Sequence, residues 1–264
     1  MKERPSFPVR LDFLDDKSRL KRSTAQRNHG MPGLGVKPAG RVLVQGLGLD
    51  SSAVRLHMVD RLAAQGIVDP LVLSAMGSIE RHRFVDTALV NQAYEETSLP
   101  IGLGQTISKP SVVARMVELL RHGAVGRLGR VLEIGTGCGY QAAVLSLLAR
   151  EVYSIERLRG LHGKARENLR HLHLANLHLL YGDGMMGYAQ GAPYAAIIAA
   201  AGGESVPPVW LEQLAVGGRL VAPIATGASS AGQQALLIVD KTAQGMHKTV
   251  LEAVHFVPLK SGVA

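Results

Sequence analysis

Cysteine, aromatic side chains and long apolar runs are all scarce in this 264-residue sequence. The single cysteine, Cys138, excludes an intramolecular disulfide framework and a zinc site built from several cysteines. Aromatic residues make up 4% of the chain against 30 glycines, which favours tight turns over an aromatic-packed sandwich. The longest apolar runs, such as residues 195–201, fall far short of the ~18 residues of a membrane span. No signal-peptide pattern is present, so we expect a soluble, cytoplasmic protein without a membrane partner.

The charge is unevenly distributed along the chain. The formal net charge is +8, and residues 1–50 carry +5 of it. A basic excess points to an acidic partner such as nucleic acid. Residues 1–50 show no sustained apolar period, and we predict a basic, poorly ordered extension. An RNA-binding arm is the alternative, but the segment lacks the basic and aromatic interleaving of base-stacking sites, so nucleic acid is not the favoured partner.

Residues 51–264 are predicted to form one α/β domain. Hydrophobic residues make up 47% of the sequence, enough for a sizeable core. Helical periodicity and capping signals predict helices at about 51–65, 70–77, 111–120, 140–149, 158–173 and 207–215. Short apolar runs predict strands at 130–134, 151–155, 177–181, 194–199, 219–224, 235–239 and 249–257. We therefore expect N-terminal helices, then a mostly parallel, Rossmann-type sheet with antiparallel C-terminal edge strands.

A glycine turn marks the predicted ligand site, because residues 131–140 run from a strand through Gly-x-Gly-x-Gly into a helix. Ligands of open parallel sheets bind beyond the carboxyl ends of the strands at such a turn. The dinucleotide fingerprint would need a further glycine where Tyr140 stands. Acids stand near three successive strand ends, at Glu133, Glu156 and Asp183. They suit a nucleoside with a ribose diol and a cationic end, and S-adenosylmethionine is such a ligand.

Several segments carry a more specific pattern. They are LPIGLGQTIS at 99–108, VLEIGTGCGYQ at 131–141, VYSIER at 152–157, GDG at 182–184, APY at 192–194, GGRLVAP at 217–223 and FVPL at 256–259. With them, residues 52–262 resemble the protein-L-isoaspartate O-methyltransferase family. The glycine turn is shared by many methyltransferases, whereas Gln-Thr-Ile-Ser and Phe-Val-Pro-Leu are specific to this family.

The resemblance implies the Rossmann-like fold of the S-adenosylmethionine-dependent methyltransferases and a function in protein repair. Such an enzyme methylates the free α-carboxylate of L-isoaspartyl residues in damaged proteins and peptides, leaving S-adenosyl-L-homocysteine. Ser108 matches the active-site serine, in a substrate loop with Gln105, Thr106 and Ile107 that belongs to the helical part, 51–125. Cofactor contacts are implied for Glu133, Gly135, Thr136, Gly137, Gly139, Glu156, Asp183 and Gly184, and no metal is implied.

The chemistry agrees with the residues present. A carboxylate has a reference pKa of about 3.9 and is already a nucleophile at neutral pH, so no general base is required. Ser108 would orient this carboxylate by a hydrogen bond. Without the resemblance, the preferred interpretation of Ser108 is the cap of the helix that begins beyond Pro110.

Other residues leave alternatives open. Cys138 is explained by the need for a small residue in the turn, although a thiol at a helix N-terminus could be acidified. Ala195 stands where the family commonly has an acid, which predicts altered fourth-strand contacts near the cofactor. Four histidines close in sequence are interpreted as a solvated helix surface, because their spacing forms no single metal face: His162, His171, His173 and His178.

Two other functions remain open from the sequence. One is a different S-adenosylmethionine-dependent methyltransferase on the same scaffold, with another acceptor. The other is a cofactor-binding module or RNA-associated protein that has lost catalysis, for which Ala195 and the basic extension are the support.

Overall fold

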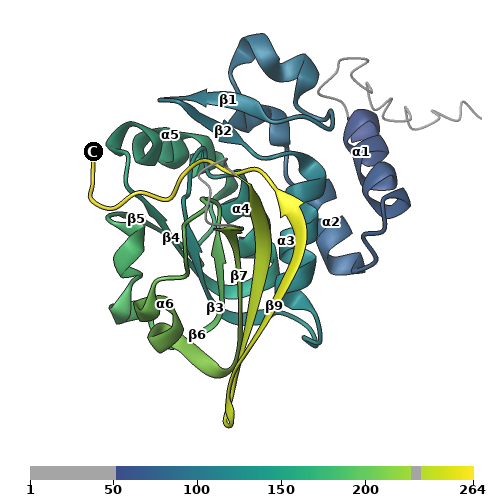
Figure 1. Ribbon diagram of the computed structural model, residues 1–264. Helices are drawn as coiled ribbons and strands as arrows, with labels where there is room; N and C mark the ends of the chain where they lie inside the picture. The colour runs from purple at the N-terminus through teal and green to yellow at the C-terminus, as the bar shows by residue number, and fades with distance from the viewer. Residues whose placement is uncertain (1–51, 227–232) are drawn as a thin grey trace, which may run out of the picture. The chain divides into compact units, whose positions relative to one another are not determined.

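The computed structural model of the chain describes residues 52–226 and 233–264 (Figure 1). The predicted basic extension, residues 1–50, lies outside the described residues. Within the described ranges, no helix is both long enough and apolar enough to cross a bilayer.

A seven-stranded sheet organises the fold, in the order β5-β4-β3-β6-β7-β8-β9. Its strands are β3 (Leu128–Ile134), β4 (Ala149–Glu156), β5 (Leu177–Tyr181), β6 (Tyr194–Ala199), β7 (Leu214–Ala225), β8 (Gln234–Thr242) and β9 (Gly245–Val254). All neighbours from β5 to β7 are parallel, whereas β8 and β9 are antiparallel. The predicted mostly parallel sheet with antiparallel strands at its C-terminal edge is confirmed.

The helices lie where the periodicity predicts them, with ends that differ by a few residues. They are α1 (Ser52–Ala64), α2 (Pro70–Ser78), α3 (Pro110–Arg121), α4 (Tyr140–Leu148), α5 (Arg159–Leu169) and α6 (Pro208–Gln213). Short 3₁₀ helices are η1 (Arg81–Phe84), η2 (Thr87–Gln92), η3 (Arg170–Leu172), η4 (Gly184–Met186) and η5 (Ala189–Gly191). Asp69 caps α2, because its carboxylate accepts hydrogen bonds from the amides of Leu71 and Val72.

Both faces of the sheet are covered, so successive strand residues enter different cores. Val131 and Ala196 point into the larger core, to which α1 to α5 contribute. Leu132 and Ile197, one position further along, point into a second core with Trp210 of α6. The central strands β3 and β6 are therefore apolar at consecutive positions, which is the pattern of a buried parallel sheet.

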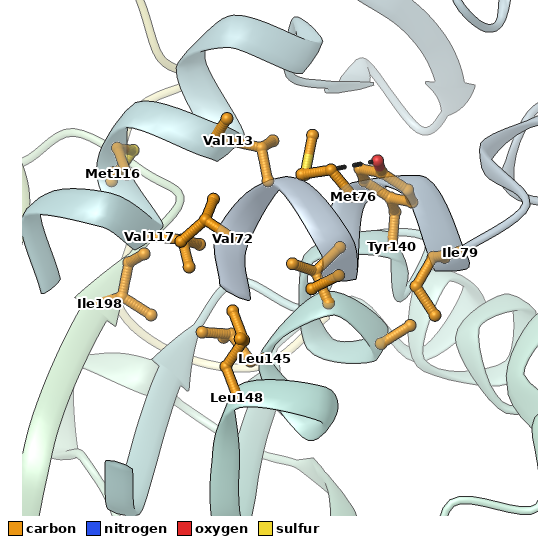
Figure 2. Close-up of a cluster of buried hydrophobic side chains, with 14 of the residues drawn as sticks. Val72, Met76, Ile79, Val113, Met116, Val117, Tyr140, Leu145, Leu148 and Ile198 are labelled. Atoms are coloured by element: carbon orange, nitrogen blue, oxygen red, sulfur yellow. Dashed lines mark hydrogen bonds between the residues drawn. The ribbon is translucent and has the colours of Figure 1, made fainter. Parts of the chain in front are cut away.

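Helix α2 packs between α3 and α4 rather than directly on the sheet. Figure 2 shows Val72 and Met76 of α2 beside Val113 and Val117 of α3, with Tyr140 of α4 on the other side. The Tyr140 hydroxyl donates a hydrogen bond to the Met76 sulfur at 3.6 Å. The N-terminal helices are therefore part of the larger core, and α2 holds the start of α4 through the contact between Met76 and Tyr140.

A two-stranded hairpin interrupts the helical part and is not predicted by the periodicity. Strands β1 (Leu99–Gly102) and β2 (Gln105–Ile107) pair antiparallel. The turn between them, residues 102–104, has positive φ throughout, and Leu103 at φ 52° is a non-glycine residue in that region. Strands of four and three residues are too short for an alternating pattern to be detected.

The start of α3 contradicts one alternative role of Ser108. Its N-cap residue is Lys109, and no side chain of that residue or of Ser108 caps the helix. Glu96 serves instead, because its carboxylate accepts hydrogen bonds from the amide and hydroxyl of Ser111. The interpretation of Ser108 as a helix cap is therefore wrong.

Gly139→Ala is predicted to lower the free energy of unfolding by about 2 kcal/mol. Gly139 has φ 93°, and an added Cβ would lie 2.8 Å from Leu169 Cδ1 of α5. Gly66→Ala is the matched control, since Gly66 has φ 99° and nothing within 4 Å of the added Cβ. It should lose about 1 kcal/mol from backbone strain alone. Urea unfolding of both variants measures the difference, and equal losses would show that the contact with α5 costs nothing.

Candidate active site

A cavity of about 300 Å³ lies at the carboxyl ends of β3, β4 and β6. Four segments contribute to its lining: the glycine turn 135–138, the hairpin and loop 101–108, residues 155–158 at the end of β4, and residues 257–260 near the C-terminus. Figure 1 shows this C-terminal segment, in yellow, crossing the edge of the sheet near the β1–β2 hairpin. The site is thus assembled from segments more than 150 residues apart in the sequence.

The glycine turn is tied to the end of β4 by its backbone. The amides of Gly135 and Thr136 both donate to the Ile155 carbonyl, at 2.9 and 3.1 Å. The Gly137 amide donates to Glu156 Oε2 at 2.9 Å. Gly135 and Gly137 have positive φ, at 91° and 57°, so the turn uses the conformational freedom of glycine.

Glu156 lies at the cavity wall and is 5% exposed. Besides the Gly137 amide on Oε2, its Oε1 accepts from the Leu158 amide at 2.9 Å. A carboxylate offers about four acceptor positions. Two backbone amides therefore fix its orientation and leave capacity for two hydroxyl donors from a ligand.

Glu133 lies beneath the turn, fully buried and outside the cavity lining. Its Oε2 accepts from the Ser154 hydroxyl at 2.5 Å, and Ser154 Oγ is 2.6 Å from Thr136 Oγ1, which reaches the cavity. Its Oε1 is buried with no hydrogen-bond partner among the described residues, as is Nε2 of Gln141. Burial raises the pKa of Glu133 to about 8, so this carboxyl is mostly protonated at neutral pH.

Two further predicted cofactor residues stand outside the lining. Asp183 Oδ1 accepts from the Met185 amide at 2.9 Å, and Oδ2 accepts from the Gly262 amide at 2.6 Å. It joins η4 to the C-terminal segment, while its neighbour Gly184 lines the cavity. Gly139 packs against α5. Cofactor contacts stay predictions for Glu133, Asp183 and Gly139 and equally for the five residues that line the cavity, Gly135, Thr136, Gly137, Glu156 and Gly184.

The predicted substrate loop lines the cavity with all four of its residues, Gln105, Thr106, Ile107 and Ser108. Thr106 is exposed, whereas Ser108 is half-buried. The Ser108 carbonyl accepts a hydrogen bond from Arg81 at 2.7 Å. Its hydroxyl makes no hydrogen bond to any described residue, so it is available to a ligand.

Cys138 is buried just before the start of α4. Burial raises the pKa of its thiol, which contradicts the alternative of an acidified thiol there. Within residues 52–226 and 233–264, no group of three acids, histidines or cysteines is placed to hold a metal ion. His178 lies on β5 and stacks on Tyr153, with ring centroids 4.7 Å apart, so the interpretation of the four histidines as one solvated helix surface is wrong for this residue.

Ala195 lies at the amino end of β6, away from the cavity. Its Cβ would be 3.0 Å from a Cβ added at Gly129, near the start of β3. The residues of this region that line the cavity are Ala200 and Ala201, beyond the other end of the strand. An effect of Ala195 on fourth-strand contacts near the cavity is therefore not expected from its position.

Sequence reasoning assigned no site role to the C-terminal segment 257–260, Tyr140 or Ala200, all of which line the cavity. A signal was present for the first, because Phe-Val-Pro-Leu at 256–259 is one of the family-specific segments. No local pattern marks Ala200, whose place follows from the pairing of β6 with β3.

The mostly parallel sheet, the glycine turn after β3 and the acid at the end of β4 define the Rossmann-like class of S-adenosylmethionine-dependent methyltransferases. Comparisons with known proteins narrow the class. The profile of the family "Protein-L-isoaspartate(D-aspartate) O-methyltransferase (PCMT)" matches residues 53–264. The chain therefore belongs to the protein-L-isoaspartate(D-aspartate) O-methyltransferase family, a family of protein-repair methyltransferases that use S-adenosylmethionine.

Individual relatives agree with this assignment. The chain is 54% identical to protein-L-isoaspartate O-methyltransferase of Methylibium petroleiphilum, over 98% of this chain and 96% of that protein. It is 57% identical to the enzyme of the same name from Leptothrix cholodnii, over 84% of this chain and 78% of that protein. A solved protein-L-isoaspartate O-methyltransferase is 27% identical with a TM-score of 0.70, covering 79% of this chain and 67% of that one.

A second solved structure shares the fold. It is a putative protein-L-isoaspartate O-methyltransferase from Plasmodium falciparum in complex with S-adenosyl-L-homocysteine, 23% identical with a TM-score of 0.68. The similarity covers 78% of this chain and 98% of that one.

Glu133→Gln is predicted to change how stability depends on pH. The folded carboxyl keeps its proton up to about pH 8, whereas an ordinary glutamate ionises near 4.5. The folded state then binds more protons than the unfolded state, so the free energy of unfolding falls as pH rises between these values. The slope reaches at most about 1.4 kcal/mol per pH unit. Unfolding from pH 5 to 8 should show this slope in the wild type and lose it in the variant.

Glu151→Gln serves as the control for that measurement. Glu151 lies on the same strand, β4, but is partly exposed and pairs with Arg130. Its variant should keep the wild-type slope. Parallel wild-type and Glu133→Gln curves would show that Glu133 is ionised in the folded protein.

Proposed function

We propose that this chain methylates the free α-carboxylate of L-isoaspartyl residues at the cavity described above, with Ser108 as the residue that holds this carboxylate. The observation that carries the assignment is that Ser108 lines the cavity and that its hydroxyl has no partner among the described residues. A hydroxyl donor that is available beside a ligand cavity suits a carboxylate acceptor.

The residues around the cavity fit S-adenosylmethionine. Its volume of about 300 Å³ is at the lower end of the usual range for small-molecule sites. Glu156 presents unused acceptor positions for the ribose hydroxyls, and Ile155 and Leu158 beside it give apolar walls for a base. When bound, the cofactor supplies a methyl group on a cationic sulfur.

The protein's own contribution to the reaction is position and exclusion of water. A carboxylate needs no general base, because it is ionised and nucleophilic at neutral pH. Ser108 donates to one carboxylate oxygen and directs the other into the cavity. Residues 101–108 and the segment 257–260 line the site on two sides, and a cofactor and substrate bound between them displace water from the reacting groups.

The partner is then a damaged protein or peptide that carries an isoaspartyl residue, and neither nucleic acid nor a membrane is required. The cytoplasmic location and any role of residues 1–50 stay predictions. A different methyl acceptor, or a module that binds the cofactor without catalysis, is the alternative to be tested.

Methyl transfer to a matched peptide pair tests this function. The purified full chain is incubated with methyl-labelled S-adenosylmethionine and either an isoaspartyl peptide or the same peptide with normal aspartate. We expect base-labile methyl esters on the isoaspartyl peptide and background on its twin. Equal labelling of both would indicate another acceptor chemistry, and cofactor binding without labelling of either would indicate a non-catalytic module.

Ser108→Ala is predicted to lower kcat/KM for the isoaspartyl peptide about 10- to 100-fold, the effect of losing one hydrogen bond to a charged group. Ser111→Ala is the matched control, because Ser111 lies in the first turn of α3, binds Glu96 and does not line the cavity. It should keep wild-type kcat/KM. A Ser108→Ala enzyme that is folded and fully active would remove the assigned role.

A further inference from the structure

Arg81 is a buried cation beside the active-site loop with no function in the mechanism above. It belongs to η1 and is 0% exposed. Its Nε donates to the Ala93 carbonyl and its Nη2 to the Ser108 carbonyl, each at 2.7 Å. Its Nη1 is buried with no hydrogen-bond partner among the described residues. The guanidinium carbon lies 4.8 Å from the centre of the Tyr140 ring, and Tyr140 lines the cavity.

The charge of Arg81 is not neutralised by an ion pair with any described carboxylate. Glu96 is close enough to favour the cation electrostatically, but its carboxylate binds Ser111. Burying an unpaired charge is costly, so such groups are usually paired. Arg121, the other buried arginine of the described residues, follows this rule, since its Nε lies 2.8 Å from Asp69 Oδ2.

The position of the unpaired charge suggests what compensates it. Arginine keeps its proton in proteins, so a positive charge is present next to the Ser108 backbone. The proposed function brings a carboxylate to the hydroxyl of the same residue. Because Arg81 is fully buried, water and salt screen its charge much less than they screen a surface charge, so it can stabilise a carboxylate held by Ser108.

We propose that Arg81 is a positioning residue for the substrate carboxylate: it fixes the Ser108 backbone and supplies the positive charge that favours an anionic over a neutral acceptor there. This inference rests on the proposed function. Arg81 acts through Ser108 and is not among the residues that line the cavity. A purely structural role, in which Arg81 only holds residues 93 and 108 together, is the competing explanation.

The test compares two peptides that differ by one charge. One carries isoaspartate with its free α-carboxylate, and the other carries the same residue with an α-carboxamide. Their dissociation constants are measured by fluorescence anisotropy on the full chain saturated with S-adenosyl-L-homocysteine, so that no turnover occurs. The readout is the ratio of the two constants, with thermal unfolding recorded for each variant.

Three variants separate charge from structure. Arg81→Gln removes the charge but keeps amide donors, Arg81→Lys keeps the charge with fewer donors, and Arg121→Met removes a buried arginine remote from Ser108. We expect Arg81→Gln to weaken binding of the carboxylate peptide about tenfold or more, with little change for the carboxamide. Arg81→Lys should restore most of the preference, and Arg121→Met should lower thermal stability with an unchanged ratio.

The outcomes distinguish this inference from the proposed function. If Arg81→Gln weakens both peptides equally, or leaves the ratio unchanged, Arg81 has a structural role and the inference is overturned. The same holds if Arg81→Lys behaves as Arg81→Gln does. If the wild type itself shows no preference for the carboxylate and methylates no isoaspartyl peptide, the proposed function fails first.

Discussion

The hydrogen bond between the Gly137 amide and the Glu156 carboxylate is the contact on which the rest of the site depends. It joins the turn after β3 to the end of β4, beside two backbone bonds from the turn to Ile155. Because the two strands are parallel neighbours, their carboxyl ends meet at one edge of the sheet. A turn held there places its own backbone and the Glu156 carboxylate at the same cavity before a ligand binds. The site is therefore preorganised, and no free energy is lost on ordering these groups during binding.

The local pattern of the sequence was sufficient for the sheet but not for the loops around the site. Buried parallel strands such as β3 and β6 are apolar at consecutive positions, and the glycine turn and Asp69 cap are encoded within a few residues. The β1–β2 hairpin lacks such a signal, and the non-glycine Leu103 in its turn adopts a conformation that its residue type does not predict. The site roles of loop residues 105–108 were predicted from the family resemblance alone.

Long-range contacts account for most of what the sequence could not predict. Asp183 was predicted to contact the cofactor, and both of its oxygens accept from backbone amides that no local pattern identifies, one of them 79 residues away at Gly262. The group that accepts from the first turn of α3 is Glu96 rather than Ser108, and it lies 15 residues before its donor Ser111. No pattern within a helix or strand can specify which distant group will satisfy an unpaired donor, because that choice depends on the packed structure.

The three acids near the strand ends have different roles because their surroundings differ. Glu156 meets two amides at the cavity and keeps capacity for a ligand, whereas Asp183 uses amides to join η4 to the C-terminal segment. Glu133 meets one hydroxyl in a fully buried position, and desolvation keeps its proton bound near neutral pH. A charged Glu133 beneath the turn would repel Glu156 above it, so the neutral form lowers the negative charge of the site.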